Sequence, residues 1–265
     1  MKKELILLKI GGGVITDKSV HYGLREDVLT RLAKEIGEAQ KNLGESKMII
    51  GNGAGSFAHF SAHKYRTTEG FVNDESRIGM GWVRHDAVKL NQIVFEQLLL
   101  ANVPVFSFSP SSLMSVENGI TKVVFMESMS DALEKEVVPL VYGDVVIDSA
   151  KGCDVYSTEK VFDELAKHYS QEYEVRVIHI SSEDGVYKKG QASVFSEITK
   201  ENFDEVKEHL GGSNGVDVSG GMLHKVEECL ALTKMGIVSQ IVSGMVAGRV
   251  RDAILGDKVK GTTIK

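Results

Sequence analysis

The stretch Gly51–His59 holds the residues of this chain that are best suited to chemistry on a phosphate group. It reads Gly-Asn-Gly-Ala-Gly-Ser-Phe-Ala-His and directly follows the apolar run Met48–Ile50, which is typical of the end of a buried strand. Glycines there let the backbone approach a ligand closely, and successive N–H groups form a cradle for an anion. His59, expected at the start of the next helix, adds a hydrogen-bond donor of adjustable charge. The stretch therefore indicates phosphate chemistry.

Three further glycine-containing loops follow predicted strands or lead into a predicted helix. They are Lys9–Gly13, Tyr142–Asp144 and Asp217–Met222, and the last leads into the helix that carries Lys225. Proteins with a parallel sheet bind their ligands just beyond the carboxyl ends of the strands. A Gly-Gly pair after a strand is most often only a tight turn, but four such loops in one chain favour a ligand site.

Lysines accompany these loops. Lys9 stands near the end of a strand otherwise made of Leu and Ile, Lys18 follows the first loop, and Lys225 lies one turn into its helix. Ammonium groups aimed at a transferring phosphate supply the electrostatic stabilisation that phosphoryl transfer needs. The alternative for each lysine is an ordinary side chain with its ammonium in solvent, and a lone histidine such as His59 is more often structural. The residues by themselves leave both interpretations open.

Other ligand motifs fit less well. A phosphate-binding loop of the type Gly-x-x-x-x-Gly-Lys-Ser/Thr is absent from the sequence. Gly53–Ala58 satisfies the dinucleotide pattern Gly-x-Gly-x-x-Ala, but Asp74 and Glu75, at the distance of its acidic partner, follow no convincing strand. His59 and His63 could share a helix face, yet no third ligand completes a zinc site. We therefore expect neither a dinucleotide cofactor nor a bound zinc ion.

The composition indicates an ordinary globular protein. Of the 265 residues 42% are hydrophobic and 26% are charged, and the net charge of −6 argues against a general nucleic-acid binder. No apolar run approaches the ~20 residues that span a bilayer. Cys153 and Cys229 form neither a zinc motif nor a disulfide framework. We expect a cytoplasmic protein without a nucleic-acid or membrane partner.

Strand-like and helix-like segments alternate along the chain, which predicts an α/β fold with a mostly parallel sheet covered on both faces. The predicted strands are Leu5–Ile10, Met48–Ile50, Val103–Phe108, Val137–Ile147, Val175–Ile180 and Gln240–Val242. The predicted helices are centred on Val28–Ala39, Val161–Tyr169 and Met222–Met235, the last capped by Gly236. We expect a surface excursion at Thr67–Arg77, a hairpin at Ser115–Lys122 and a mobile loop at Gly211–Gly215.

Taken in order, these motifs resemble the amino acid kinase superfamily, and within it the isopentenyl phosphate kinases. The segments that carry the resemblance over nearly the whole chain are Leu8–Lys18, Gly53–His59, Pro139–Val146, Asp184–Tyr187, Asp217–Lys225 and Lys260–Ile264. Gly-Ser-Phe-x-His is the element that separates this branch, with its fosfomycin-kinase-like relatives, from other branches. The resemblance implies an open αβα sandwich, a dimer, and ATP-dependent phosphorylation of isopentenyl phosphate for isoprenoid synthesis.

The resemblance also implies roles for individual residues. Lys9 and the backbone of Gly11, Gly12 and Gly13 would hold the transferring phosphate, and Lys18 and Lys225 would neutralise it. On the acceptor side the residues would be Ala54, Gly55, His59, Gly143 and Asp144. Around the nucleotide they would be Asp184, Tyr187, Gly220 and Met222. Mg²⁺ would bridge the phosphates of ATP with few direct protein ligands.

Three positions depart from the family pattern. Gly13 stands where a serine is usual, and Asn52 where the branch often has histidine. Ser157-Thr158-Glu159 occupies the place of Ser-Gly-Asp, whose aspartate is thought to orient the catalytic lysines. Glu159 could take that role with a longer arm, or Ser157 could simply cap a helix start.

Two alternative functions remain open from the sequence. One is a kinase for another small phosphate or phosphonate such as fosfomycin, and the other is a non-catalytic regulator with the same fold. A prenyl acceptor needs an apolar slot, for which Ile78, Met80, Val83 and Phe106–Phe108 are candidates. The single domain would divide its work, with residues 1–150 mainly binding the acceptor and residues 151–265 mainly binding the nucleotide.

Overall fold

The computed structural model describes residues 2–210 and 221–265. The strands are β1 (Glu4–Ile10), β2 (Lys47–Asn52), β3 (Val105–Ser107), β4 (Met114–Glu117), β5 (Ile120–Val124), β6 (Val138–Tyr142), β7 (Asp144–Asp148), β8 (Gly152–Tyr156), β9 (Glu174–Ser181), β10 (Glu197–Ile198), β11 (Val238–Ser243) and β12 (Gly261–Ile264). The α-helices are α1 (Gly12–Ile15), α2 (Glu26–Gln40), α3 (Gly55–Tyr65), α4 (Glu75–Leu100), α5 (Pro110–Leu113), α6 (Glu127–Glu134), α7 (Thr158–Tyr169), α8 (Phe203–Leu210), α9 (Gly221–Leu232) and α10 (Arg249–Ile254). Two short 3₁₀ helices, η1 (Thr67–Glu69) and η2 (Thr233–Met235), complete the described elements.

The large sheet places the strands β9, β1, β2 and β6 side by side. Within the described residues it has eight strands in the order β10-β12-β11-β9-β1-β2-β6-β3, and β11–β12 is its one antiparallel pair. The central strand β1 reads Leu-Ile-Leu-Leu without alternation because both of its faces are buried. Its neighbours β9 and β2 run parallel to it, so their carboxyl ends meet at one edge.

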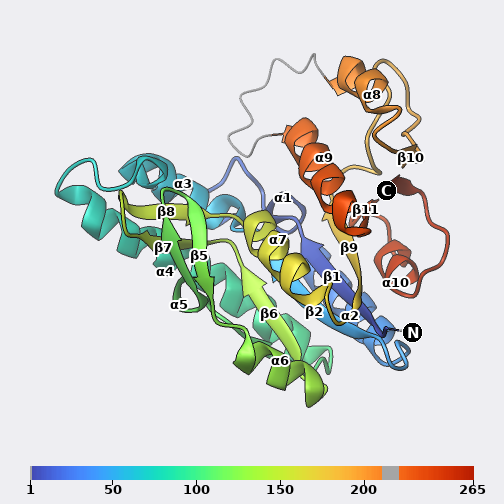
Figure 1. The fold of residues 1–265 in the computed structure, drawn as a ribbon, viewed down its shortest axis with the longest axis horizontal. Coiled ribbons are helices and arrows are strands. Elements are labelled where there is room, and N and C mark those ends of the chain that lie inside the picture. The colour runs from blue at the N-terminus through green and yellow to red at the C-terminus, as the bar shows by residue number, and fades with distance from the viewer. Residues whose placement is uncertain (1, 211–220) are drawn as a thin grey trace.

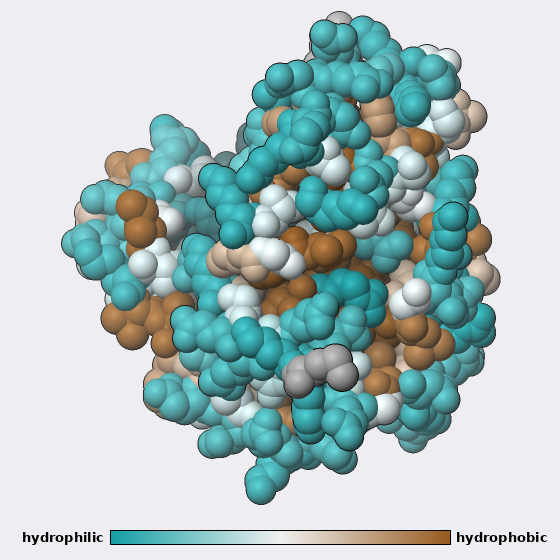
Figure 2. All heavy atoms as spheres, turned by 45° about the vertical axis from the view of Figure 1, so that its right-hand side comes forward, coloured by the Kyte–Doolittle hydropathy of each residue, from teal (hydrophilic) through white to brown (hydrophobic). Residues whose placement is uncertain are grey.

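Helices cover both faces of this sheet (Figure 1). The apolar stripe of α2 packs with residues of α4 and α10 against one face, and α6 and α7 pack against the other. A third cluster joins α8 and α9 to the strands β10, β11 and β12. The predicted open αβα sandwich is confirmed by this layering. The face shown in Figure 2 is largely hydrophilic, with scattered apolar patches.

A smaller sheet of four strands, in the order β5-β4-β7-β8, lies beside the large one within the described part of the chain. The predicted hairpin is confirmed as β4 and β5, and its turn holds Asn118 and Gly119 at positive φ angles of 51° and 74°. The carboxylate of Asp148 accepts backbone N–H groups from both turn residues, at 3.0 and 2.7 Å, and so fixes this tip.

Two sequence predictions are corrected. Val137–Ile147 is not one strand, because the chain breaks at Gly143 and β6 and β7 belong to different sheets. Thr67–Arg77 is largely exposed, as expected, but it contains η1 and the start of α4, and Thr67 and Ser76 are fully buried. The predicted mobile loop at Gly211–Gly215 lies outside the described residues. No helix among the described residues combines the length and the apolar character needed to cross a bilayer.

Candidate active site

A cleft of about 1500 Å³ opens at the carboxyl ends of β9, β1, β2 and β6. The chain segments that follow these strands form its floor, and the first turns of α3, α7 and α9 contribute to its walls. The sequence-predicted residues that line it are Lys9, Gly11, Gly12, Gly13, Lys18, Ala54, Gly55, His59, Gly143, Asp144, Glu159, Met222 and Lys225. Residues up to about 215 positions apart in the chain thus meet in one cavity.

The first two glycine loops pack backbone to backbone. A Cβ atom on Gly53 would lie 2.8 Å from the backbone nitrogen of Gly12, and one on Gly12 would collide with the backbone of Gly55. Gly55 also has a positive φ of 52°, which side chains rarely adopt. Glycine is therefore required at these positions for the two loops to come together.

Thr16 locks the two loops together. Its hydroxyl donates a hydrogen bond to the carbonyl of Gly12 at 2.7 Å and accepts one from the backbone N–H of Ser56 at 3.0 Å. Thr16 is fully buried, so these bonds are shielded from water and hold the entrance of α3 against α1.

Lys9 and Glu159 form an ion pair on the floor of the cleft. The Lys9 ammonium donates a hydrogen bond to the Glu159 carboxylate, and Lys9 is only 6% exposed. Burial by itself would raise the pKa of Glu159, but the charge and hydrogen bond of Lys9 outweigh it and hold that pKa at about 2. Ser157 caps α7, because its hydroxyl accepts a hydrogen bond from the N–H of Lys160 at 3.2 Å. The helix cap at Ser157 and the ion pair of Glu159 with Lys9 are therefore both present.

Lys225 brings a second ammonium from α9 towards the same pair. Burial lowers the pKa of Lys225, the charge of Lys9 lowers it further, and the carboxylate of Glu159 opposes both. His179 lies beneath this group, next to Lys9 in the β1–β9 register. Burial, followed by the charges of Lys9 and Lys225, lowers the pKa of His179 to about 3, which keeps its imidazole neutral.

Lys18 reaches the cleft from the loop between α1 and α2. Its Cε atom lies 3.0 Å from the point where a Cβ on Gly13 would stand. A side chain at position 13 would therefore press on the flexible end of Lys18. Glycine, in place of the serine that is usual in the resembling family, leaves this lysine room.

The predicted acceptor-side residues come from α3 and from the end of β6. Ala54 precedes the first turn of α3, and His59 is an exposed residue one turn further along that helix. A Cβ on Gly143 would lie 3.2 Å from Thr158 Oγ1 and 3.7 Å from the nitrogen of Ala54, so the backbone of β6 closely approaches this point.

Asp144 is committed to partners inside the protein. It is 1% exposed and accepts hydrogen bonds from Arg84 Nη1 at 2.7 Å and from the N–H of Ser111 at 3.3 Å. Its carboxylate therefore holds the wall of the cleft in place by anchoring α4 and α5.

The predicted nucleotide residues are more dispersed. Met222 lines the cleft, whereas Asp184 and Tyr187 are not among its lining residues. Asp184 pairs with Arg249 at 2.5 Å and with Lys260 at 2.6 Å, which fixes the chain after β9 to β12 and α10. Gly220 lies outside the described residues.

Several charged lining residues were not predicted from the sequence. Besides Asp17, Arg25, His63 and Arg66, they include Glu228, one turn beyond Lys225 on α9. Burial, followed by the charge of the nearby Glu159, raises the pKa of Glu228 to about 7. Helical i, i+3 spacing from Lys225 is the signal that could have placed Glu228 on the cleft face.

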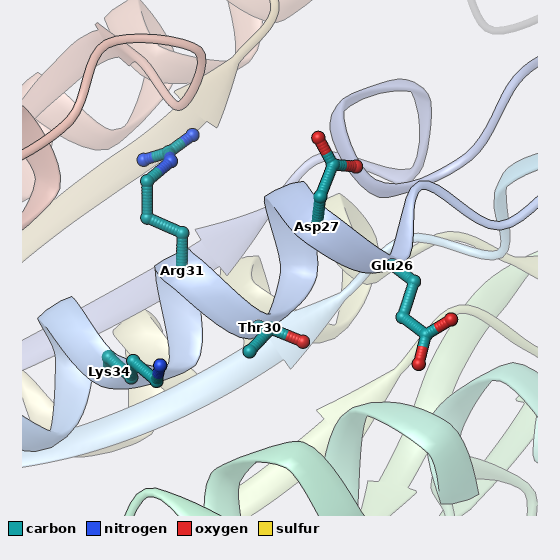
Figure 3. A pocket seen from close by; sticks show the side chains of 5 residues that line it. All are labelled: Glu26, Asp27, Thr30, Arg31 and Lys34. Carbon is teal, nitrogen blue, oxygen red and sulfur yellow. The ribbon is translucent and has the colours of Figure 1, made fainter.

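A second, open depression lies on the outer face of α2 (Figure 3). Glu26, Asp27, Thr30, Arg31 and Lys34 line it. It is formed by one helix surface with side chains of both signs and gathers none of the glycine loops, so we assign it no chemistry. Among the described residues, no group of three or more His, Cys, Asp or Glu side chains is arranged to hold a metal ion.

Comparisons with known proteins agree with this geometry. Residues 4–243 match the family model described as the amino acid kinase family. Isopentenyl phosphate kinase of Methanothermobacter thermautotrophicus is 35% identical over 271 residues, covering 98% of both chains. Isopentenyl phosphate kinase of Methanocaldococcus jannaschii is 30% identical over 269 residues, with the same coverage.

Solved structures show the same fold. One described as "X-ray structures of isopentenyl phosphate kinase" superposes with a TM-score of 0.81 at 31% identity, covering 98% of this chain and 100% of that one. A substrate complex of isopentenyl phosphate kinase superposes with a TM-score of 0.75 at 21% identity, covering 98% of this chain and 100% of that one, and shows the fold alone.

Proposed function

The chain belongs to the amino acid kinase family, and we propose that it transfers a phosphoryl group from ATP to isopentenyl phosphate. The resemblance predicted from the sequence is confirmed by the family model and by the curated relatives over nearly the whole chain. The observation that carries the function is the cleft itself. It gathers Lys9, Lys18, Lys225 and His59 together with two interlocked glycine loops in one cavity.

The residues divide into donor and acceptor groups. The N–H groups of Gly12 and Gly13 and the ammonium groups of Lys9 and Lys225 would hold the γ-phosphate, with Lys18 beside them. The N–H of Gly11 is not available for this role, because it donates to the carbonyl of Ile180 at 3.0 Å. His59 and the N–H groups at Ala54 and Gly55 would hold the acceptor phosphate. Glu159 would keep Lys9 oriented, since the two side chains already form an ion pair.

The reaction needs charge neutralisation more than proton abstraction. An acceptor phosphate is already an anion, so one of its oxygens attacks the γ-phosphorus directly. The new P–O bond forms as the bond from the γ-phosphorus to the bridging oxygen breaks, and ADP leaves with that electron pair. Positively charged side chains offset the repulsion between the two phosphates. Mg²⁺ bound by the phosphates of ATP would supply further charge neutralisation, with few direct protein ligands.

An apolar slot favours a prenyl tail over a small polar phosphonate. Small apolar side chains of α3 and α4, Ala58, Ala62, Val83 and Ala87, line the cleft. Of the residues that the sequence suggested for the slot, Val83 lines the cleft, and Met80 packs against the buried cluster that contains Val83. Ile78 and Phe106 are instead 68% and 57% exposed. These apolar lining residues support isopentenyl phosphate over fosfomycin as the acceptor.

We also propose the division of labour that the sequence predicts, with residues 1–150 mainly serving the acceptor and residues 151–265 mainly serving ATP.

Exposed apolar residues support a homodimer. They are Leu99 and Leu100 at the end of α4 and Phe106 on the edge strand β3. Sedimentation velocity should give the mass of a dimer, and the mass of one chain would contradict this. Two free, buried thiols, Cys153 and Cys229, fit a reducing cytoplasm.

The experiment is ATP turnover by the purified protein with Mg²⁺ and one acceptor at a time. The acceptors are isopentenyl phosphate, fosfomycin, N-acetylglutamate and UMP. We expect selective turnover with isopentenyl phosphate. Preference for another acceptor would replace the substrate while keeping the mechanism, and inactivity with all four despite ATP binding would favour a non-catalytic regulator.

A further inference from the structure

A buried carboxylate lies behind the acceptor side of the cleft, on α4. Asp86 is 2% exposed and accepts a hydrogen bond from the hydroxyl of Tyr22 at 2.5 Å and another from the hydroxyl of Ser61. The Nδ1 atom of His85 lies 2.9 Å from the same carboxylate, and Nε2 of His21 lies 3.9 Å away. A buried carboxylate needs such partners, and these come from three different elements of the chain.

Tyr22 belongs to the loop that carries Lys18. Its backbone has a positive φ of 60°, a conformation that a tyrosine keeps only when its surroundings hold it. The ring lies edge-on to Phe57 of α3 with centroids 5.0 Å apart, and the ammonium of Lys89 of α4 lies 3.9 Å from its centroid. Burial, then the hydrogen bond to Asp86, raise the pKa of Tyr22 to about 12, so its hydroxyl remains a donor.

The Lys18 loop is short and closed on itself, so fixing Tyr22 restricts Lys18. The N–H of Asp17 donates to the carbonyl of Gly23 at 2.6 Å, and the N–H of Gly23 donates to the carbonyl of Val20 at 2.9 Å. A bridge between Thr16 and Leu24 closes the base of the loop.

Ser61 is the other end of the connection. It lies on α3, two residues beyond His59, and is 6% exposed. Because Asp86 accepts the Ser61 hydroxyl with one oxygen and the Tyr22 hydroxyl with the other, it holds α3 and the Lys18 loop at a fixed separation.

We propose that Asp86 is a positioning residue for phosphoryl transfer, which sets the distance between Lys18 and His59 through Tyr22 and Ser61. This inference rests on the proposed function, because it places Lys18 at the donor phosphate and His59 at the acceptor phosphate. Two anions must be brought into line for transfer, and small displacements of the groups that hold them lower the rate steeply.

The first test is Tyr22→Phe, which removes one hydroxyl and keeps the ring. We expect kcat to fall about tenfold, with the KM values for ATP and isopentenyl phosphate changing less than about threefold, because alignment is lost and binding is kept. Tyr173→Phe is the matched control, since its hydroxyl also donates to a carboxylate, Glu134 at 3.2 Å, outside the cleft lining. The control should leave kcat unchanged.

A double-mutant cycle separates positioning from general loosening of the structure. In a Lys18→Ala background, Tyr22→Phe should lower kcat no further, because the group that it positions is gone. A further tenfold fall there, or an unchanged kcat for Tyr22→Phe alone, would overturn the proposal. Ser61→Ala should lower kcat in the same direction as Tyr22→Phe.

Hydrogen exchange tests the same connection without turnover, so a failure of the proposed function would not decide it. In the ligand-free protein, Tyr22→Phe should speed amide exchange in residues 17–24 and in α3 relative to wild type and to Tyr173→Phe. Unchanged exchange in these segments would show that the hydroxyl does not hold the loop, and would overturn the proposal.

Discussion

Glu159 is the residue on which the charge arrangement of the cleft most directly depends. Its carboxylate neutralises one of the ammonium groups that would otherwise repel each other on the floor of the cleft, and the low pKa of about 2 keeps it ionised. Losing that charge would leave Lys9 and Lys225 close together without a counter-ion. The ammonium groups would then move apart, away from the position that we propose for the transferring phosphate.

The first prediction compares two changes at this position. Glu159→Asp should keep most of the turnover, since it preserves the charge, whereas Glu159→Ala should lower kcat by about 10²-fold. Steady-state kinetics with ATP and isopentenyl phosphate measure both. Ser157→Ala is the control for helix capping and should cost about 1 kcal/mol of stability while leaving kcat near wild type. Equal kcat values for the two Glu159 variants would show that Glu159 has only a structural role.

His59 offers a second residue-scale prediction. His59→Gln keeps a hydrogen-bond donor but cannot become charged, so kcat/KM for isopentenyl phosphate should fall by about 10²-fold while ATP binding is retained. His168→Gln, on α7 and outside the cleft lining, is the control. If the His59 variant kept its thermal transition and near-normal turnover, His59 would have a structural role and not a catalytic one.

The raised pKa of Glu228 leads to a prediction of how the free energy of unfolding depends on pH. Its pKa is raised from 4.5 to about 7 in the folded protein, so the folded state holds this proton longer than the unfolded chain does. The resulting stabilisation is complete below pH 4.5 and is lost as the pH rises through about 7. Melting temperatures of wild type and Glu228→Gln should therefore diverge in favour of the variant from pH 5 to 8, by roughly 2–4 °C per kcal/mol. A constant difference over this range would contradict the raised pKa.

At the scale of elements, the site depends on two loops that touch through their backbones. Gly12 opens α1 and Gly53 precedes α3, and neither position has space for a Cβ atom. The loops are therefore positioned by contact with each other as well as by the strands β1 and β2 that lead into them. In the proposed site this contact would hold the loop that serves the donor phosphate next to the loop that serves the acceptor phosphate.

This packing gives a matched pair of glycine variants. Gly12→Ala should abolish transfer and destabilise the protein, because its methyl group would meet the backbone of Gly55. Gly81→Ala, in α4 with nothing within 4 Å of the added Cβ, should stabilise the protein by about 0.5–1 kcal/mol and leave turnover unchanged. Denaturant unfolding and steady-state kinetics measure both. A fully active, stable Gly12→Ala protein would show that the loops can separate.

The sequence predicted the strands that are continuously apolar and the helices with a clear stripe, because both signals are local. It did not predict the 26-residue helix α4. The first half of α4 contains Gly79 and Gly81 and a buried Ser76, so its inward face does not read as apolar. Tyr65 of α3 packs directly against Gly79, so position 79 has no space for a side chain. The sequence does not reveal this contact.

The glycine loops and the lysines of the site could be predicted because they form short motifs. The connection through Asp86 could not, since Tyr22 and Asp86 stand 64 positions apart and Asp86 lies in an element that the sequence did not indicate. Glu228 differs, because it follows Lys225 by three residues on α9 and this local spacing could have placed it on the cleft face.

At the scale of the whole molecule, one sheet edge collects the parts of a phosphotransferase. The ends of β9, β1, β2 and β6 bring the glycine loops together, and α3, α7 and α9 add the charged side chains. Helices α3 and α4 add the apolar side chains of Ala58, Ala62, Val83 and Ala87 to the cleft lining. A phosphate that carries an apolar tail matches this combination of a charged floor and an apolar end.

The most direct measurement follows the phosphorus atoms themselves by ³¹P NMR in a mixture of protein, ATP, Mg²⁺ and isopentenyl phosphate. We predict that the acceptor monophosphate signal is replaced by the two coupled signals of a diphosphate, with one ADP formed for each acceptor consumed. Formation of ADP together with inorganic phosphate, with the acceptor signal unchanged, would show that the acceptor phosphate is not the nucleophile and would contradict the proposed function.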